Sequence, residues 1–95
     1  MNGRKALSWK ISIDSRAKKE LNKLDKFAQK KIITYLKTKI ETSENPRLFG
    51  KALQGNKKGL WRYRVENYRL ICQILDDELL ILVVKVGHRK NIYLD

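Results

Sequence analysis

Apolar and polar residues alternate along the first patterned segment of the chain, residues 7–13. Successive side chains of a β-strand point to opposite sides, so a period of two places the apolar residues on one face. This segment is therefore predicted to be a strand with one buried face and one polar face. The apolar residues are Leu7, Trp9, Ile11 and Ile13.

The period then changes to that of two helices. Asp14-Ser15 supplies an N-cap for a short helix, and Asp25 can cap a second one. Pro46 disfavours helical geometry at the residue before it, so the second helix is expected to end near Glu44. The short connection between them predicts an antiparallel helical hairpin. The helical apolar positions are Ala17, Leu21 and Leu24, then Ala28, Ile32, Leu36 and Ile40.

A period of two returns after residue 60 and predicts three more strands. They cover Trp61–Val65, Tyr68–Leu75 and Leu79–Val86. Glu66-Asn67 and Asp76-Asp77 fall where tight hairpin turns are needed, and Asn and Asp tolerate the positive φ of such turns. The last strand is apolar on both faces, which is typical of a strand with neighbours on both sides.

These elements together predict an α+β fold: an N-terminal strand, an antiparallel helical hairpin and a three-stranded antiparallel meander in a small, mostly antiparallel sheet. The helices should pack on that sheet. With 95 residues the chain fits one domain, residues 1–95, because two separate cores would each be too small to be stable.

Charge narrows the possible partners. The chain has 22 Lys and Arg against 10 Asp and Glu, a formal net charge of +12. Such a chain attracts polyanions, so the partners to consider are nucleic acid, an acidic membrane surface or an acidic protein. The longest apolar run, Leu79–Val84, is too short to cross a membrane, and no signal peptide is visible. We expect a cytoplasmic protein.

Cysteine and histidine chemistry is limited. The chain has one Cys and one His, too few for the usual ligand set of a zinc site, so no metal site is predicted. Cys72 lies in an alternating apolar stretch and is expected to be an inert core thiol.

The alternation of side chains along the predicted strands places three arginines on one face of the sheet. If Glu66-Asn67 forms the turn, Arg64 pairs with Arg69 across the hairpin, and Arg62 shares their face. Like charges directly opposite destabilise paired strands. Solvent screening, or carboxylates supplied by a helix, would be a purely structural explanation. The functional alternative is a phosphate-binding groove, because residues 51–69 hold six Lys or Arg and one carboxylate. The loop contributes Lys51, Lys57 and Lys58.

A second basic cluster, residues 87–93, follows the last strand and contains no carboxylate. The cationic neighbours of His88 favour its neutral form, which can accept a proton. Tyr93 would either pack on the sheet or stack on a base.

These residues resemble the RelE/ParE toxin superfamily over nearly the whole chain. The resemblance rests on four segments: Leu53-Gln-Gly55, Trp61-Arg-Tyr-Arg-Val65, Tyr68-Arg69-Leu70 and Val86-Gly-His-Arg-Lys-Asn-Ile-Tyr93. It implies a type II toxin of the RelE branch, whose members cut mRNA in the ribosomal A site and are held inactive by an antitoxin.

The resemblance also assigns roles to positions. Arg62 and Arg64 match places where RelE-like enzymes often have basic residues. Arg69 and Arg89 match the two arginines linked to the scissile phosphate, and Tyr93 lies near the C-terminal tyrosine of the active site.

The implied reaction is attack of a ribose 2′-hydroxyl on the adjacent phosphate, without metal or cofactor. Arginines suit charge stabilisation. With pKa values above about 12 they suit proton transfer poorly. Some RelE enzymes have lysines here, and an arginine in place of a catalytic lysine leaves the general acid and base open. His88 is the first choice for one of these roles, and Tyr93 would need activation by the surrounding arginines to act as the base. The predicted catalytic residues are Arg69, His88, Arg89 and Tyr93. The predicted RNA-binding residues are Lys51, Lys57, Lys58, Arg62, Arg64 and Lys90.

Two other functions remain open at this point. One is a ParE-like inhibitor of DNA gyrase, and the other is a nucleic-acid-binding relative without catalytic activity. The expected partners are a cognate antitoxin with an acidic or amphipathic helix, mRNA on the ribosome, and operator DNA reached only as the toxin–antitoxin complex.

Overall fold

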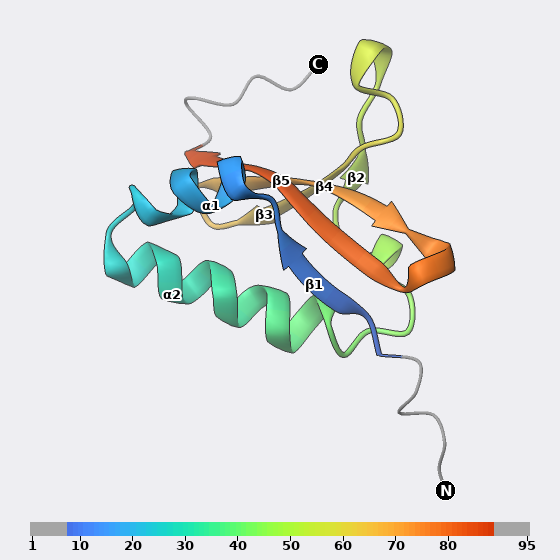
Figure 1. Cartoon of the computed structure of the whole chain (residues 1–95), viewed down its shortest axis with the longest axis horizontal. Helices are drawn as coiled ribbons and strands as arrows, with labels where there is room; N and C mark the ends of the chain where they lie inside the picture. The colour runs from blue at the N-terminus through green and yellow to red at the C-terminus, as the bar shows by residue number, and fades with distance from the viewer. Residues whose placement is uncertain (1–7, 89–95) are drawn as a thin grey trace, which may run out of the picture.

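The structure, a computed structural model, describes residues 8–88 and has the predicted α+β architecture (Figure 1). A five-stranded sheet has the order β1-β5-β4-β3-β2. β1 runs parallel to β5, and the other neighbours are antiparallel, so the sheet is mostly antiparallel as predicted. The strands are β1 (Lys10–Ile13), β2 (Lys51–Ala52), β3 (Trp61–Val65), β4 (Tyr68–Leu75) and β5 (Leu80–His88).

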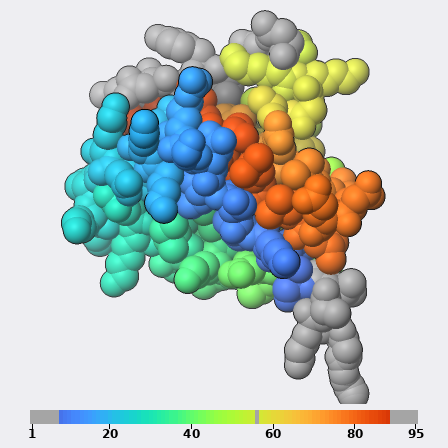
Figure 2. All heavy atoms as spheres, in the orientation of Figure 1, coloured from blue at the N-terminus to red at the C-terminus, as the bar shows by residue number. Residues whose placement is uncertain are grey.

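The helices begin where their caps were predicted. α1 (Ser15–Asn22) starts after Asp14, whose carboxylate accepts from the Arg16 backbone N–H, and α2 (Lys26–Tyr35) starts after Asp25, which accepts from Ala28 at 2.7 Å. These bonds satisfy backbone donors that have no partner inside a helix. α1 packs against β5, and α2 returns beneath the sheet (Figure 1; the blue and red-orange atoms touch in Figure 2).

α2 ends earlier than predicted. It continues as one π-helical turn, η2 (Leu36–Ile40), and stops there instead of near Glu44. The Glu41 carbonyl accepts from the Trp9 backbone N–H at 3.3 Å, and the Ser43 N–H bonds back to Ile40 at 3.1 Å in a tight turn. The end is therefore set by contact with the segment before β1, which the local effect of Pro46 could not predict.

The β3–β4 hairpin has the predicted register. Val65 pairs with Tyr68 and Arg64 with Arg69 around the Glu66-Asn67 turn, where Glu66 has a φ of +55°. The second turn is longer than the predicted Asp-Asp pair: a 3₁₀ turn (Asp76–Glu78) is followed by Leu79 at a φ of +50°. β5 therefore starts one residue later than predicted and extends beyond Val86. It lies between β1 and β4, which confirms its interior position.

The core lies between the sheet and the helices. Tyr63, Leu70, Ile81 and Val83 of the sheet meet Ile32 of α2, all nearly inaccessible to solvent. A smaller cluster lies on the other face of the sheet, where Leu53 and Ile71 are buried beside Leu60 and Val84. One face of the sheet is therefore covered by the helices and carries the main core, and the opposite face carries only the smaller cluster.

The edge strand β2 was not predicted. It follows Gly50, which has a φ of +83° and lies so close to β3 that a Cβ atom there would meet the Arg62 carbonyl oxygen at 2.1 Å. Trp61 Nε1 donates to the Phe49 carbonyl at 2.7 Å, and the Tyr63 hydroxyl donates to the Pro46 carbonyl at 2.9 Å. These contacts hold the segment along β3 and place Lys51 opposite Arg62.

Candidate nucleic-acid interface

The candidate site lies on the face of the sheet opposite the helices, which we call the open face. Tyr63 and Val65 of β3 point into the helix-covered core, so the alternating residues Arg62 and Arg64 point the other way. Directly paired residues of neighbouring strands share a face. The register thus assigns further side chains to the open face.

Cross-strand pairing arranges these side chains in two rows. In the first row Lys51 lies opposite Arg62, Arg62 opposite Ile71, and Ile71 opposite Lys85. The second row runs from Arg64 to Arg69 and ends at Gly87. The structure therefore brings together four of the predicted residues, Lys51, Arg62, Arg64 and Arg69.

The open face carries charge of one sign. β2, β3, β4 and β5 contain Lys51, Arg62, Arg64, Arg69 and Lys85 and no carboxylate. The proposed structural explanation, carboxylates from a helix, does not fit Arg62 and Arg64, because both helices lie on the other face. At the edge of β5, however, Lys85 lines a hollow together with Glu20 of α1. Glu20 of α1 accepts instead from the Val86 backbone N–H at 2.8 Å. A single-sign surface of this kind favours polyanions.

One carboxylate in each hairpin turn is bound to a cation away from the open face. Glu66, the one carboxylate within residues 51–69, forms an ion pair with Lys31 of α2. Asp76 makes a two-pronged ion pair with Arg47, with both distances 2.8 Å. The guanidinium of Arg47 holds the pKa of Asp76 below its ordinary value.

Arg62 is only partly exposed, and its side chain is incompletely satisfied. Its Nε atom is buried and has no hydrogen-bond partner among residues 8–88. Leaving a buried donor without a partner costs about 1–3 kcal/mol, and more for a charged group.

The loop between β2 and β3 projects away from the helices, above the sheet in Figure 1. Leu53 and Leu60 anchor its two ends by packing on Ile71 and Val84 of the open face. The predicted residues Lys57 and Lys58 lie in this loop, and Lys58 is exposed. The loop therefore adds positive charge on the same side of the sheet.

His88 lies on the other side. It pairs directly with Tyr68, which in turn pairs with the core residue Val65, so its side chain belongs to the helix-covered face. The rings of His88 and Tyr68 meet edge to face with centroids 5.5 Å apart. The register thus assigns the side chains of His88 and Arg69 to opposite faces of the sheet, on neighbouring positions of β5 and β4. The predicted residues Arg89, Lys90 and Tyr93 lie outside the described residues.

Sequence reasoning missed Lys85. Its strand is otherwise uncharged, and the predicted element was treated as an apolar interior strand. An irregularity in the β4–β5 ladder between Ile71 and Cys72 also breaks the simple alternation, so parity along β5 alone could not assign a face to Lys85. Lys85 could have been found only from its pairing with Ile71, and that pairing follows from the register between β4 and β5.

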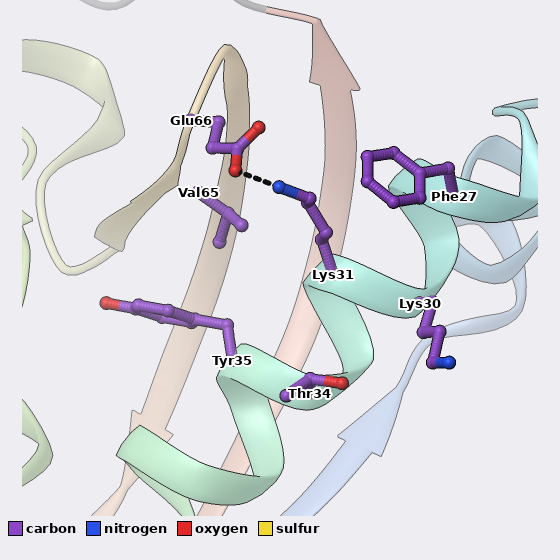
Figure 3. Close-up of a pocket in the computed structure, with 7 residues that line it drawn as sticks. All are labelled: Phe27, Lys30, Lys31, Thr34, Tyr35, Val65 and Glu66. Carbon is purple, nitrogen blue, oxygen red and sulfur yellow. Dashed lines mark hydrogen bonds and ion pairs between the residues drawn. The ribbon is translucent and has the colours of Figure 1, made fainter.

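Two further features lie away from this face. Cys72 is fully buried, and burial raises its thiol pKa, as expected of an inert core cysteine. A hollow of about 430 Å³ lies between α2 and the β3–β4 turn (Figure 3). Phe27 of its lining is 70% exposed and lies under the Lys31 ammonium, 4.8 Å from the ring centroid. Neither feature contains a predicted site residue. Within residues 8–88, no helix is long and apolar enough to span a membrane.

Comparison with known proteins gives consistent similarities. A family described as the ParE toxin of type II toxin-antitoxin systems matches residues 11–93. A RelE-like toxin protein from Escherichia coli is 32% identical over 86 residues, covering 90% of this chain and 87% of its own length. The mRNA interferase toxin RelE of Escherichia coli strain K12 is 28% identical with the same coverage.

Solved structures match the fold. The toxin of the RelBE2 toxin-antitoxin complex from Mycobacterium tuberculosis superposes with a TM-score of 0.80 at 21% identity, over 90% of this chain and 95% of that one. The Escherichia coli RelBE toxin-antitoxin complex gives a TM-score of 0.69 at 25% identity, over 85% of this chain and 96% of that one.

Proposed function

The chain belongs to the RelE/ParE superfamily of toxins from type II toxin-antitoxin systems, and from this premise we propose that it is an endoribonuclease that cleaves messenger RNA in the ribosomal A site. The observation that carries the proposal is the open face, where two rows of cross-strand neighbours hold cations and no carboxylate. Guanidinium groups bind phosphate oxygens two at a time, so this face suits an RNA backbone.

The proposed chemistry needs no metal. The ribose 2′-oxygen attacks the adjacent phosphorus, an O2′–P bond forms, and the P–O5′ bond breaks. The 2′-hydroxyl gives its proton to a base, and the leaving 5′-oxygen receives a proton from an acid. Negative charge grows on the phosphate oxygens in the transition state. Arg69 and Arg64, paired at the hairpin end of the open face, are proposed to stabilise that charge.

Proton transfer is assigned to His88 and Tyr93, and Arg89 is assigned to the scissile phosphate beside Arg69. These three assignments come from the sequence and its resemblance. His88 is the last residue of β5, and its pairing with Tyr68 assigns its side chain to the helix-covered face. To transfer a proton to RNA on the open face, its ring would have to reach past the end of β5. The pH dependence of cleavage tests this role, because replacing a catalytic acid or base costs roughly 10²–10⁴-fold in rate and removes one limb of the profile. An unchanged profile in His88→Gln would withdraw the role.

A cognate antitoxin is the proposed partner. Several structures similar to this chain are toxin-antitoxin complexes that contain RelB. A toxin with a net charge of +12 and a basic open face would bind RNA indiscriminately unless it were covered. We propose an antitoxin with an acidic or amphipathic helix, a complex that binds operator DNA, and action in the cytoplasm where mRNA is translated.

The deciding experiment is expression of the toxin without a partner, followed by primer-extension mapping of ribosome-bound mRNA. New 5′ ends within translated codons, formed also in purified translation reactions to which the toxin is added, support the proposal. The family match to ParE toxins favours one alternative, inhibition of DNA gyrase. Intact mRNA together with arrested gyrase would establish that alternative. Intact mRNA with active gyrase, and RNA binding alone, would indicate a relative without catalytic activity.

A further inference from the structure

Lys85 is the charged residue of an otherwise uncharged strand, and it is exposed. Its direct neighbour on β4 is Ile71, whose other neighbour is Arg62, opposite Lys51 at the sheet edge. Lys85 and Lys51 therefore end one row of four cross-strand neighbours on four strands. Since neighbouring strands lie about 4.8 Å apart, the row spans about 14 Å.

The backbone around Lys85 is held on both sides. Towards β4, the ladder irregularity between Ile71 and Cys72 places an extra residue of β5, Val84, beside Lys85 on the open-face side, where Val84 joins the buried cluster. Towards α1, Glu20 accepts the next backbone N–H, that of Val86, at 2.8 Å. Lys85 thus projects from a fixed point of the sheet and not from a loop, which favours a defined contact over a diffuse charge.

We propose that Lys85 contacts an RNA phosphate, and that the RNA backbone crosses the strands along this row from β5 to β2. The inference rests on the proposed function of the open face. A distance of about 14 Å between the ends of the row exceeds the size of one phosphate group, so Lys85 and Lys51 engage different phosphates. Arg62 lies between them and binds the backbone at the middle of the row. The second row, Arg64 and Arg69, is left for the scissile phosphate.

Salt dependence of binding tests the contact. The probe is a short uridine oligonucleotide, with affinity measured by fluorescence anisotropy over a range of salt concentrations. Each phosphate contact contributes about 0.7 to the slope of log K against log salt for single strands. Lys85→Gln is expected to lower the slope by about 0.7, and Lys51→Gln by the same amount. The double variant should lower it by about twice as much if the two lysines hold different phosphates.

Lys37→Gln is the matched control, because Lys37 is exposed on the helical side and its loss changes net charge equally. Circular dichroism verifies that each variant is folded. If the wild-type protein does not bind the oligonucleotide, the proposed contact of Lys85 with RNA is refuted, whereas the proposed function is decided separately by the primer-extension mapping. If it binds, and Arg62→Gln weakens it while Lys85→Gln behaves like Lys37→Gln, the proposed function stands and the role of Lys85 is refuted. A double variant no weaker than either single variant would refute a path across the strands.

Discussion

Arg64 lies directly opposite Arg69 across the β3–β4 hairpin, one step from the Glu66-Asn67 turn. The nearest carboxylate along the chain, Glu66, is bound to Lys31 of α2 and so faces the helices. A second like-charged pair, Lys51 with Arg62, lies at the sheet edge. Two such pairs in one small sheet oppose folding, which is expected where an anionic ligand supplies the compensating charge.

Arg64→Thr is predicted to separate stability from function. It removes one charge of the opposed pair and introduces a residue with high strand propensity. The free energy of unfolding in urea should stay the same or rise by roughly 0.2–1 kcal/mol. Growth arrest should be lost, and RNA binding should weaken by the loss of one phosphate contact. Arg16→Thr, an exposed change on α1, is the control and should retain full toxicity. A destabilised Arg64→Thr protein would show that Arg64 serves the fold, and a fully toxic one would show that Arg64 has no role in toxicity.

The sequence predicted this hairpin because its two determinants are local. Alternation assigns faces, and the Glu66-Asn67 turn sets the register, so the pairing of Arg64 with Arg69 followed without knowledge of the tertiary structure. β2 was missed because it exists only through the close approach of Gly50 to β3.

The sheet faces of His88 and Lys85 could not be predicted from the local sequence pattern. The helix-covered position of His88 depends on its pairing with Tyr68, and the open-face position of Lys85 depends on its pairing with Ile71. Both pairings lie beyond a ladder irregularity that shifts the register of β5 against β4. The alternation of residues within β5 does not reveal that shift. The three-dimensional register was therefore needed to assign Lys85 to the open face and His88 to the helix-covered face.

Gly50→Ala is predicted to be far more damaging than Gly59→Ala. Both glycines have positive φ, +83° and +98°, so both substitutions carry a backbone strain of about 1–2 kcal/mol. At Gly59 a Cβ atom meets nothing within 4 Å, whereas at Gly50 it meets the Arg62 carbonyl oxygen at 2.1 Å. Gly50→Ala must therefore also displace β2 from β3. Urea unfolding of the two variants measures the difference, and equal losses would contradict the close approach.

The Arg47–Asp76 ion pair is predicted to make stability depend on acid pH. The hydrogen bond from Arg47 lowers the pKa of Asp76 from its ordinary 3.8. The folded state therefore gains from the charged carboxylate above pH 3.8 and loses that gain as the pH falls through the lower, folded value. Arg47→Gln should be less stable than the wild type near neutral pH and equal to it at the acid end. Parallel urea titrations at several pH values check this, and a difference that persists in acid would argue against the pair.

Tyr63→Phe is predicted to reveal the buried hydroxyl of the core. This hydroxyl donates to the Pro46 carbonyl at 2.9 Å, and that carbonyl also accepts from the Phe49 backbone N–H at 3.4 Å. Removal of the hydroxyl therefore loses one buried hydrogen bond without leaving the acceptor empty, and should cost about 0.5–1.5 kcal/mol. Burial also raises the pKa of Tyr63 above its ordinary 10.0. Its contribution to stability is therefore complete below pH 10 and declines above it, by up to about 1.4 kcal/mol per pH unit. The stability deficit of Tyr63→Phe relative to the wild type should shrink as the pH rises beyond 10.

Tyr35→Phe is the matched control, because Tyr35 is only half-buried and its hydroxyl makes no hydrogen bond within residues 8–88. If both variants lose the same stability, the bond to Pro46 contributes nothing specific to holding the segment that leads into β2.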